Sequence, residues 1–121
     1  MTYDPENVFA KILRGEIPAK KLYEDDVALA FPDLHPQAPT HVLVIPKGPY
    51  KNHDDFSAHA TDAEIAGFTR AIGKVIDITG AADQGYRLIA NCGAHGGQEV
   101  PHYHVHILAG RKLGRMLPSA S

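Results

Sequence analysis

The sequence predicts an α+β domain built on a five-stranded antiparallel sheet with one long and one short helix. Three observations support this prediction. Short runs of β-formers are joined in pairs by tight turns, one segment shows a sustained helical repeat of apolar residues, and a segment near the C-terminus alternates histidines with β-formers. The chain of 121 residues is long enough for one hydrophobic core, so we assign 1–121 to a single domain with a tail from about 110 to 121.

Two segments have the features of helices. In the first, Asp4 and the proline after it fit the N-cap and the first helical position, and Gly15 fits the C-terminal stop. The apolar residues between them fall on one face of this short helix. In the second, Thr61 and Glu64 have the spacing of a capping box, and apolar residues repeat with the helical period up to Gly80. This long helix should lie across a sheet.

Five segments have the composition of strands. The first two flank Asp25-Asp26, which predicts a hairpin. The third is the most apolar and should be buried on both faces. The segment 47–57 is predicted to be a polar loop, and the glycine-rich segment 92–97 a turn that leads into the last strand. The predicted strands are 20–24, 27–31, 41–45, 86–90 and 102–108.

The last predicted strand contains His102, His104 and His106, separated by single β-formers. Successive side chains of a strand point to opposite faces, so these imidazoles would share one face at a spacing of roughly 6–7 Å. On a helix the same positions would diverge and could not converge on one ligand. Neutral imidazoles are costly to bury side by side, and imidazolium cations would repel one another. This stretch is therefore the first candidate for a functional site.

Three interpretations of this stretch stay open on the residues alone. It could be a solvated strand face that is rich in histidine. It could be a zinc site, because His-x-His on a strand aims two nitrogens at one ion. His41 would then join the group, although the outer two histidines of the strand lie too far apart to share a small ion easily. It could instead carry nucleophilic catalysis, in which one imidazole attacks and its neighbours handle protons. The single cysteine, Cys92, excludes an intrachain disulfide and argues against a cysteine-rich zinc site.

Charge and hydropathy exclude several classes of partner. The formal net charge of −2 gives no positive footprint for duplex nucleic acid or for an anionic membrane surface. A phosphate ligand would therefore be held by local donors. The first residues lack the basic and apolar regions of a signal peptide, and the apolar run 42–45 near the site is far too short to span a membrane. We expect a cytoplasmic protein.

Further motifs accompany the histidine pattern across roughly residues 8 to 118. They are Val8-Phe9-x-x-Ile12, Ile17-Pro18-Ala19, Glu24-Asp25-Asp26, Ala30-Phe31, Pro36-Gln37-Ala38-Pro39-Thr40-His41, Val44-Ile45-Pro46-Lys47, Gly85-Tyr86-Arg87 and Gly96-Gly97-Gln98. With these motifs the chain resembles the histidine triad (HIT) family of nucleotide hydrolases and transferases, and within it the bacterial form of the nucleotide-binding branch. Two positions depart from that branch. Glu99 stands where animal members carry a hydroxyl residue, and Pro101 is more typical of dinucleoside polyphosphate hydrolases.

The resemblance implies a role for each imidazole. His104 would be the nucleophile, because an imidazole with a pKa near 6.5 has a free lone pair at pH 7 once an acceptor holds its other N–H. In the family that acceptor is a backbone carbonyl, here that of His102. His106 would contact the phosphate and help to protonate the departing nitrogen. His102 and His41 would support the site and relay protons. Four other histidines match no family role and are expected to face solvent: His35, His53, His59 and His95.

The resemblance also implies a nucleotide pocket. Asp33 would accept hydrogen bonds from the ribose hydroxyls, and an apolar clamp would hold the base. Gln98 and the backbone N–H groups of Gly96 and Gly97 are candidate phosphate donors, because glycine lets the main chain approach an anion closely. Glu99 is not assigned as a proton donor, since a carboxylate there would weaken phosphate binding unless it turned away. The clamp is Val8, Phe9, Ile12, Phe31 and Leu34; Asn91, Gly97, Gln98, Glu99 and Val100 complete the predicted substrate-binding set.

The activity that the resemblance implies is hydrolysis of the P–N bond of purine nucleoside 5′-phosphoramidates through a nucleotidyl-histidine, with no cofactor and no metal. The alternatives are a dinucleoside polyphosphate hydrolase of the same family and a non-catalytic nucleotide-binding regulatory module. The family further implies a homodimer joined through a helix and an edge strand, in which two five-stranded sheets form one ten-stranded sheet. The tail from Gly110 onward could then reach the partner's pocket. The expected ligand is a purine nucleoside monophosphate or phosphoramidate, and neither nucleic acid nor a membrane is expected as a partner.

Overall fold

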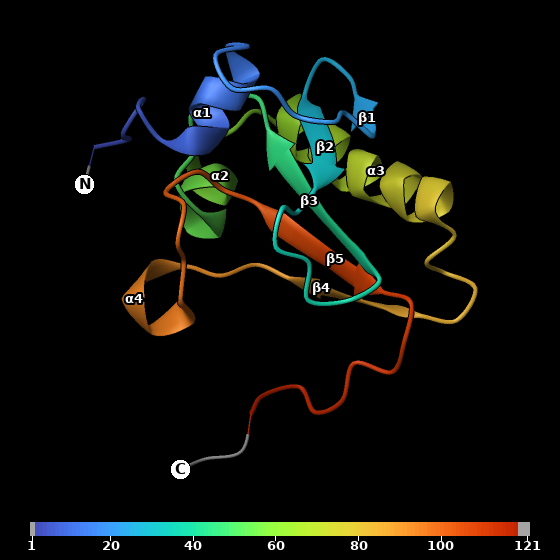
Figure 1. Cartoon of the computed structure of the whole chain (residues 1–121). Helices are drawn as coiled ribbons and strands as arrows, with labels where there is room; N and C mark the ends of the chain where they lie inside the picture. Colours follow the sequence, from blue (N-terminus) through green and yellow to red (C-terminus); the bar gives the residue numbers. More distant parts are fainter. Residues whose placement is uncertain (1, 119–121) are drawn as a thin grey trace.

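The computed structural model of the protein describes residues 2–118 and confirms the five-stranded antiparallel sheet, with strand order β1-β2-β3-β5-β4 (Figure 1). Helices number four in the described part of the chain, because two short helices join the two that the sequence predicts. None of these helices is long and apolar enough to cross a membrane. The strands are β1 (Tyr23–Glu24), β2 (Ala28–Pro32), β3 (Thr40–Pro46), β4 (Tyr86–Ile89) and β5 (Val105–Ala109); the helices are α1 (Val8–Leu13), α2 (His53–His59), α3 (Asp62–Thr79) and α4 (Gly93–Gly96).

The sheet separates two hydrophobic clusters. On one face α3 packs through Phe68 and Val75 against alternate residues of the central strands, such as Val44 and Ile107. On the other face α1 packs through Phe9 against a smaller cluster from β2 and β3. Every residue of β3 after the first is buried, because both faces of this strand are covered. The predicted burial of this segment on both faces is confirmed.

The predicted start of the first helix is wrong. The N-cap of α1 is Asn7, whose side-chain oxygen accepts the backbone N–H of Ala10 at 2.9 Å. Asp4 instead accepts the backbone N–H of Glu6 and forms a turn ahead of the helix. The stop is where the sequence places it, since Gly15 follows the last turn with φ of +78°.

The long helix α3 agrees with the prediction at both ends. The Thr61 side chain accepts the backbone N–H of Glu64, and the Glu64 carboxylate accepts the backbone N–H of Thr61, which completes the capping box. Gly80 ends the helix in the left-handed region with φ of +71°.

The segment 47–57 is not a continuous polar loop, because α2 occupies part of it. Asn52 caps this helix through the backbone N–H of Asp55, and two acidic residues lie in the first turn, where the helix dipole favours them. A single buried residue, Phe56, anchors α2 to the core. One apolar contact makes no visible helical repeat, which explains why the periodicity does not reveal this helix.

The histidine strand begins later than predicted. β5 starts at Val105, so His102 and His104 precede the regular strand and only His106 lies in it. The pairing of β5 with β3 begins at Val44 and Val105. It does not extend back to His102 and His104, because β3 ends at Pro46, which has no N–H to donate. The alternation of faces nevertheless persists. The residues between the histidines join the core beneath α3, while the imidazoles face the side of α1.

The C-terminal tail follows β5 and is tied to the domain as far as residue 118. The Arg87 guanidinium on β4 donates to the carbonyls of Gly114 and Arg115, and the Arg111 guanidinium donates to the carbonyl of Gln37. The last part of the predicted tail, residues 119–121, lies outside the described residues.

Candidate active site

A cavity of about 790 Å³ opens between α1, the loop after β2 and the glycine-rich segment that precedes β5. Twelve of the fifteen predicted site residues line it, so the fold brings together most of the set. Three do not line it: His41, His102 and Gln98. The predicted residues that line it are Val8, Phe9, Ile12, Phe31, Asp33, Leu34, Asn91, Gly97, Glu99, Val100, His104 and His106.

His104 presents one free nitrogen to this cavity. Its Nδ1 lies 2.7 Å from the backbone oxygen of His102, which can only accept, so Nδ1 carries the proton and Nε2 keeps its lone pair. The predicted carbonyl partner is therefore confirmed. The Phe9 ring meets the imidazole edge to face, with centroids 5.0 Å apart, and restricts its rotation. The side chain is buried, with 6% of the residue exposed.

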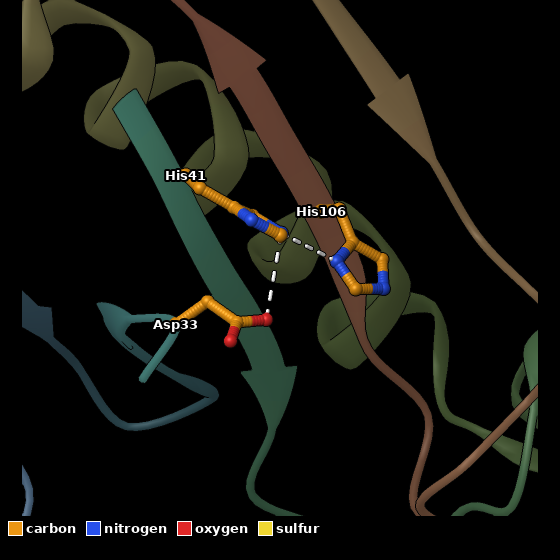
Figure 2. A group of neighbouring side chains, drawn as sticks. All are labelled: Asp33, His41 and His106. Carbon is orange, nitrogen blue, oxygen red and sulfur yellow. Dashed lines mark hydrogen bonds and ion pairs between the residues drawn. The ribbon is translucent and has the colours of Figure 1, made fainter. Parts of the chain in front are cut away.

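His106 and His41 form a hydrogen-bonded pair (Figure 2). The rings of His106 and His104 are in contact, with centroids 5.0 Å apart. The Nδ1 atom of His41 accepts the backbone N–H of Gln37 at 3.0 Å, so the proton of its neutral ring is on Nε2. That N–H donates to Nδ1 of His106 at 2.9 Å, which leaves the proton of His106 on Nε2. The Asp33 carboxylate lies 3.5 Å from Nε2 of His41. His106 thus offers the cavity a donor where His104 offers a lone pair.

His102 is fully buried and supports the site from behind. Its Nε2 lies 2.8 Å from the backbone oxygen of Pro46 and must donate to it. Its Nδ1 lies 2.7 Å from the hydroxyl of Tyr3, which must therefore be the donor. His102 reaches the cavity only through its carbonyl, which holds His104.

Burial keeps the imidazoles of the site neutral at pH 7. Loss of solvation is the main cause that lowers the pKa of His102 to about 4. The hydrogen bond to the carbonyl of Pro46 acts in the opposite direction, and the nearby ring of His104 also lowers the pKa. Loss of solvation, followed by the charges of His104 and His41, lowers the pKa of His106 to about 4. Burial also lowers the pKa of His104 and of His41, while the Asp33 carboxylate opposes both shifts. His104 therefore faces the cavity as a neutral base, and His106 as a neutral donor.

Among the described residues, the group that could hold a metal ion is Asp33, His41 and His106, whose ligand atoms lie within 4.8 Å of one another. This is not the four-histidine set that the sequence suggested, because His102 is turned to Pro46 and Tyr3. The two facing nitrogens of His41 and His106 already share a proton. A metal ion would have to displace it, so the arrangement is satisfied by hydrogen bonding alone.

The clamp and the acid line the same cavity as the imidazoles. Phe9 and Phe31 pack edge to face at 5.5 Å and form its floor. Leu34 is 90% exposed on the loop after β2, and Val8 is also exposed at the start of α1. One carboxylate oxygen of Asp33 accepts the backbone N–H of His35, which fixes this loop beside the clamp. Exposed apolar side chains on a cavity wall are typical of a site that binds a ligand.

Gln98 holds the glycine-rich segment and lies outside the cavity lining. Its amide nitrogen donates to the carbonyls of Lys51 and Val100, and its amide oxygen accepts the backbone N–H of Gly93. Because its amide group makes these three bonds, the side chain of Gln98 is not directed at the cavity. Gly97, in the left-handed region with φ of +74°, lines the cavity, but its backbone N–H donates to the carbonyl of Ala94 at 3.1 Å and ends α4.

Sequence reasoning missed two groups. The first lines the cavity between α1 and β1 and around the loop after β2, where no periodic pattern gives a signal, although Ile17-Pro18-Ala19 belongs to the motifs of the resemblance. The second is Tyr3, whose contact with His102 spans 99 positions. His35, which was expected to face solvent, is exposed but lies on the cavity wall. The missed lining residues are Ile17, Pro18, Ala19, Lys20, Pro32, His35, Gln37 and Leu43.

Comparison with known proteins identifies the family of the chain. The family model of the HIT domain matches residues 14–113. A purine nucleoside phosphoramidase of Escherichia coli K12 is 46% identical over 112 residues, which cover 93% of each chain. An uncharacterized HIT-like protein of Azospirillum brasilense is 64% identical over 116 residues, 96% of this chain and 95% of that protein. The crystal structure of a histidine triad protein from Clostridium difficile superposes with a TM-score of 0.82 at 44% identity, covering 96% of this chain and all of that one. The chain therefore belongs to the HIT domain family.

Proposed function

We propose that this hydrolase cleaves the P–N bond of adenosine and guanosine 5′-phosphoramidates, and that a nucleotidyl-histidine forms on His104. The observation that carries the proposal is the unprotonated Nε2 of His104, which faces a cavity with an apolar clamp on one side and a hydrogen-bond donor, His106, on the other. The 46% identity to the Escherichia coli phosphoramidase supports the same substrate class.

The substrate would lie along the cavity. A purine would pack between the clamp side chains, including Phe9 and Leu34, and lose most of its contact with water. The ribose hydroxyls would donate to the carboxylate of Asp33. This places the α-phosphate near His104, where Nε2–H of His106 is available as a donor. Stacking on apolar groups favours a large flat base and discriminates weakly between adenine and guanine.

In the first step, the lone pair on Nε2 of His104 attacks the α-phosphorus while the P–N bond breaks and its electron pair leaves with nitrogen. An amide anion is a very poor leaving group, so nitrogen must receive a proton. The bound phosphate anion favours the protonated form of the His41–His106 pair, and Nε2 of His106 delivers this proton. The ring of His104 then carries a positive charge, which the carbonyl of His102 stabilises at Nδ1–H.

In the second step, water attacks the same phosphorus. The bond between phosphorus and Nε2 of His104 breaks, and its electron pair returns to the imidazole as a lone pair. The proton released by water goes back to the His41–His106 pair. The net reaction yields a nucleoside monophosphate and a free amine, and every imidazole ends in its starting form.

The experiment that tests the proposal is His104→Ala, assayed on an adenosine 5′-phosphoramidate, a diadenosine polyphosphate and AMP binding. We expect kcat on the phosphoramidate to fall by about 10³-fold or more, because the covalent route disappears. His95→Ala, which removes an exposed imidazole outside the cavity, is the matched control and should keep full activity. Trapped wild-type enzyme should carry a nucleotidyl group on His104 by mass spectrometry.

Each alternative has its own outcome. Faster turnover of the diadenosine polyphosphate than of the phosphoramidate would assign the enzyme to the dinucleoside polyphosphate hydrolases, in which a proline is more typical at the position of Pro101. Nucleotide binding without hydrolysis that depends on His104 would make the protein a regulatory module. Loss of activity after chelation of metal ions, restored by zinc, would return the cluster of Asp33, His41 and His106 to a metal site.

We also propose that two copies pair through the edge strand β4. Tyr86 and Leu88 on this strand, and Ile78 on the adjoining α3, are large apolar side chains left exposed. An edge strand with unpaired backbone groups and apolar side chains is a template for a second sheet. The mass in solution should be that of a dimer, and Leu88→Arg should lower it to a monomer; a monomeric wild-type chain rejects this proposal.

A further inference from the structure

We propose that Tyr3 is a positioning residue of the active site: its hydroxyl holds the buried ring of His102, and the carbonyl of His102 holds the nucleophile. The inference rests on the proposed role of His104 as the attacking group. It assigns a task to the segment that precedes α1, which neither lines the cavity nor belongs to the sheet.

Three short hydrogen bonds meet at His102, two on its ring and one on its backbone oxygen. The Tyr3 hydroxyl donates to Nδ1 of His102 at 2.7 Å, and Nε2–H of the same ring donates to the carbonyl of Pro46 at 2.8 Å. The backbone oxygen of His102 then accepts Nδ1–H of His104 at 2.7 Å. Each donor has one acceptor, so every proton position is fixed. The carbonyl of His102 places the lone pair of His104 on the nitrogen that faces the cavity, and the ring of the same residue is held by Tyr3 and Pro46.

The backbone around His102 makes this dependence strong. Residues 101–104 lie outside the ladder of β5, which begins at Val105, so strand hydrogen bonds do not hold them. The next residue, Tyr103, is held by its backbone N–H, which bonds to the carbonyl of Tyr50, and by its side chain, which is buried in the core. His102 itself is held by its ring, and the carbonyl that holds His104 belongs to the same residue.

The hydroxyl of Tyr3 supplies the hydrogen-bond donor that Nδ1 of His102 requires. His102 is fully buried, and without a donor its Nδ1 would be an acceptor with no partner. The ring would regain a partner by rotating or by admitting water, and either change moves the carbonyl on the same residue. The aromatic ring of Tyr3 makes a separate contact with His102, edge to face at 5.7 Å. Phenylalanine would keep this contact and lose only the donor, which separates positioning from packing.

The test is Tyr3→Phe, measured against Tyr23→Phe as the matched control. Tyr23, on β1, also donates a 2.7 Å hydrogen bond, but its acceptor is Asp25. We expect Tyr3→Phe to lower kcat on an adenosine 5′-phosphoramidate about tenfold with KM nearly unchanged, because the clamp and Asp33 are intact. The ¹⁵N resonance of Nδ1 of His102 should move toward that of an unbonded ring nitrogen. The Nδ1 proton of His104 should exchange faster with water.

The control Tyr23→Phe should leave kcat, the resonance and the exchange rate as in the wild type. The inference fails if Tyr3→Phe leaves these three quantities unchanged, or if Tyr23→Phe changes them equally, which would indicate a general loss of stability. Failure of the proposed function is a different result: His104→Ala would then turn over the substrate normally. The resonance and the exchange rate are read without substrate, so they decide the role of Tyr3 even in that case.

Discussion

The buried ring of His102 should lower the free energy of unfolding in acid, and a substitution of this residue separates its contribution from that of other groups. Its folded-state pKa is about 4 because burial disfavours the charged form, whereas the unfolded chain takes up a proton near pH 6.5. Below pH 6.5 the unfolded state therefore binds more protons than the folded state, and stability falls as pH falls. At pH 4 this difference amounts to about 3 kcal/mol for this one residue.

The perturbation is His102→Gln, which removes the titrating group and keeps a polar side chain. The free energy of unfolding is measured by urea titration at pH 7 and at pH 4 for the wild type and the variant. The variant should be less stable at pH 7, because the bonds to Pro46 and Tyr3 are disturbed. Between the two pH values, however, it should lose about 3 kcal/mol less than the wild type.

His95→Gln is the control for removing a histidine from the chain, because its ring is exposed on α4. Carboxylates contribute equally to the wild type and to both variants, so they cancel in the comparison. If the wild type and His102→Gln lose the same stability between pH 7 and pH 4, the ring of His102 is not held neutral by burial and the reasoning is refuted.

Three further predictions test the helix, a turn and the pocket. Thr61→Ala removes half of the capping box with Glu64 and should lower the free energy of unfolding by about 1 kcal/mol; an unchanged urea midpoint would contradict the cap. Gly110→Ala should cost about 1–3 kcal/mol, since φ is +99° and the new Cβ would lie 2.7 Å from Cβ of Pro39; equal stability would show that the turn can move. Leu34→Ala should raise KM for the nucleotide about tenfold and leave Tm unchanged, because the side chain is 90% exposed without ligand; an unchanged KM would remove it from the clamp.

Local sequence patterns were enough to predict the elements whose signals lie within a few consecutive residues. The capping residues of α3, the glycine that ends it and the apolar segment that becomes β3 lie where the sequence predicts them. The same patterns fail for α2, which contributes only Phe56 to the core, and for the start of α1, where Asp4 and Asn7 are both suitable caps. Choosing between such caps depends on which turn packs against the sheet.

The pocket was predictable as a set of residues because the motifs of the family name most of its wall. Its hydrogen bonding was not. Gln98 has the composition of a phosphate donor, yet its amide is consumed by three backbone groups of neighbouring loops. A side chain with two donors and an acceptor can serve either purpose, and only the positions of Lys51 and Gly93 decide between them.

Residue patterns along the chain are enough to assign the five strands, the family and the chemical types gathered at the site. Which nitrogen carries the proton in His102 and in His106 depends on the fold. A neutral histidine has two tautomers of similar energy, and the choice falls to whichever donor or acceptor lies within hydrogen-bonding distance. Those partners come from distant positions: Tyr3 for His102 and His41 for His106. His104 is the exception, because its acceptor is the carbonyl of His102, two residues away, which the family resemblance predicts.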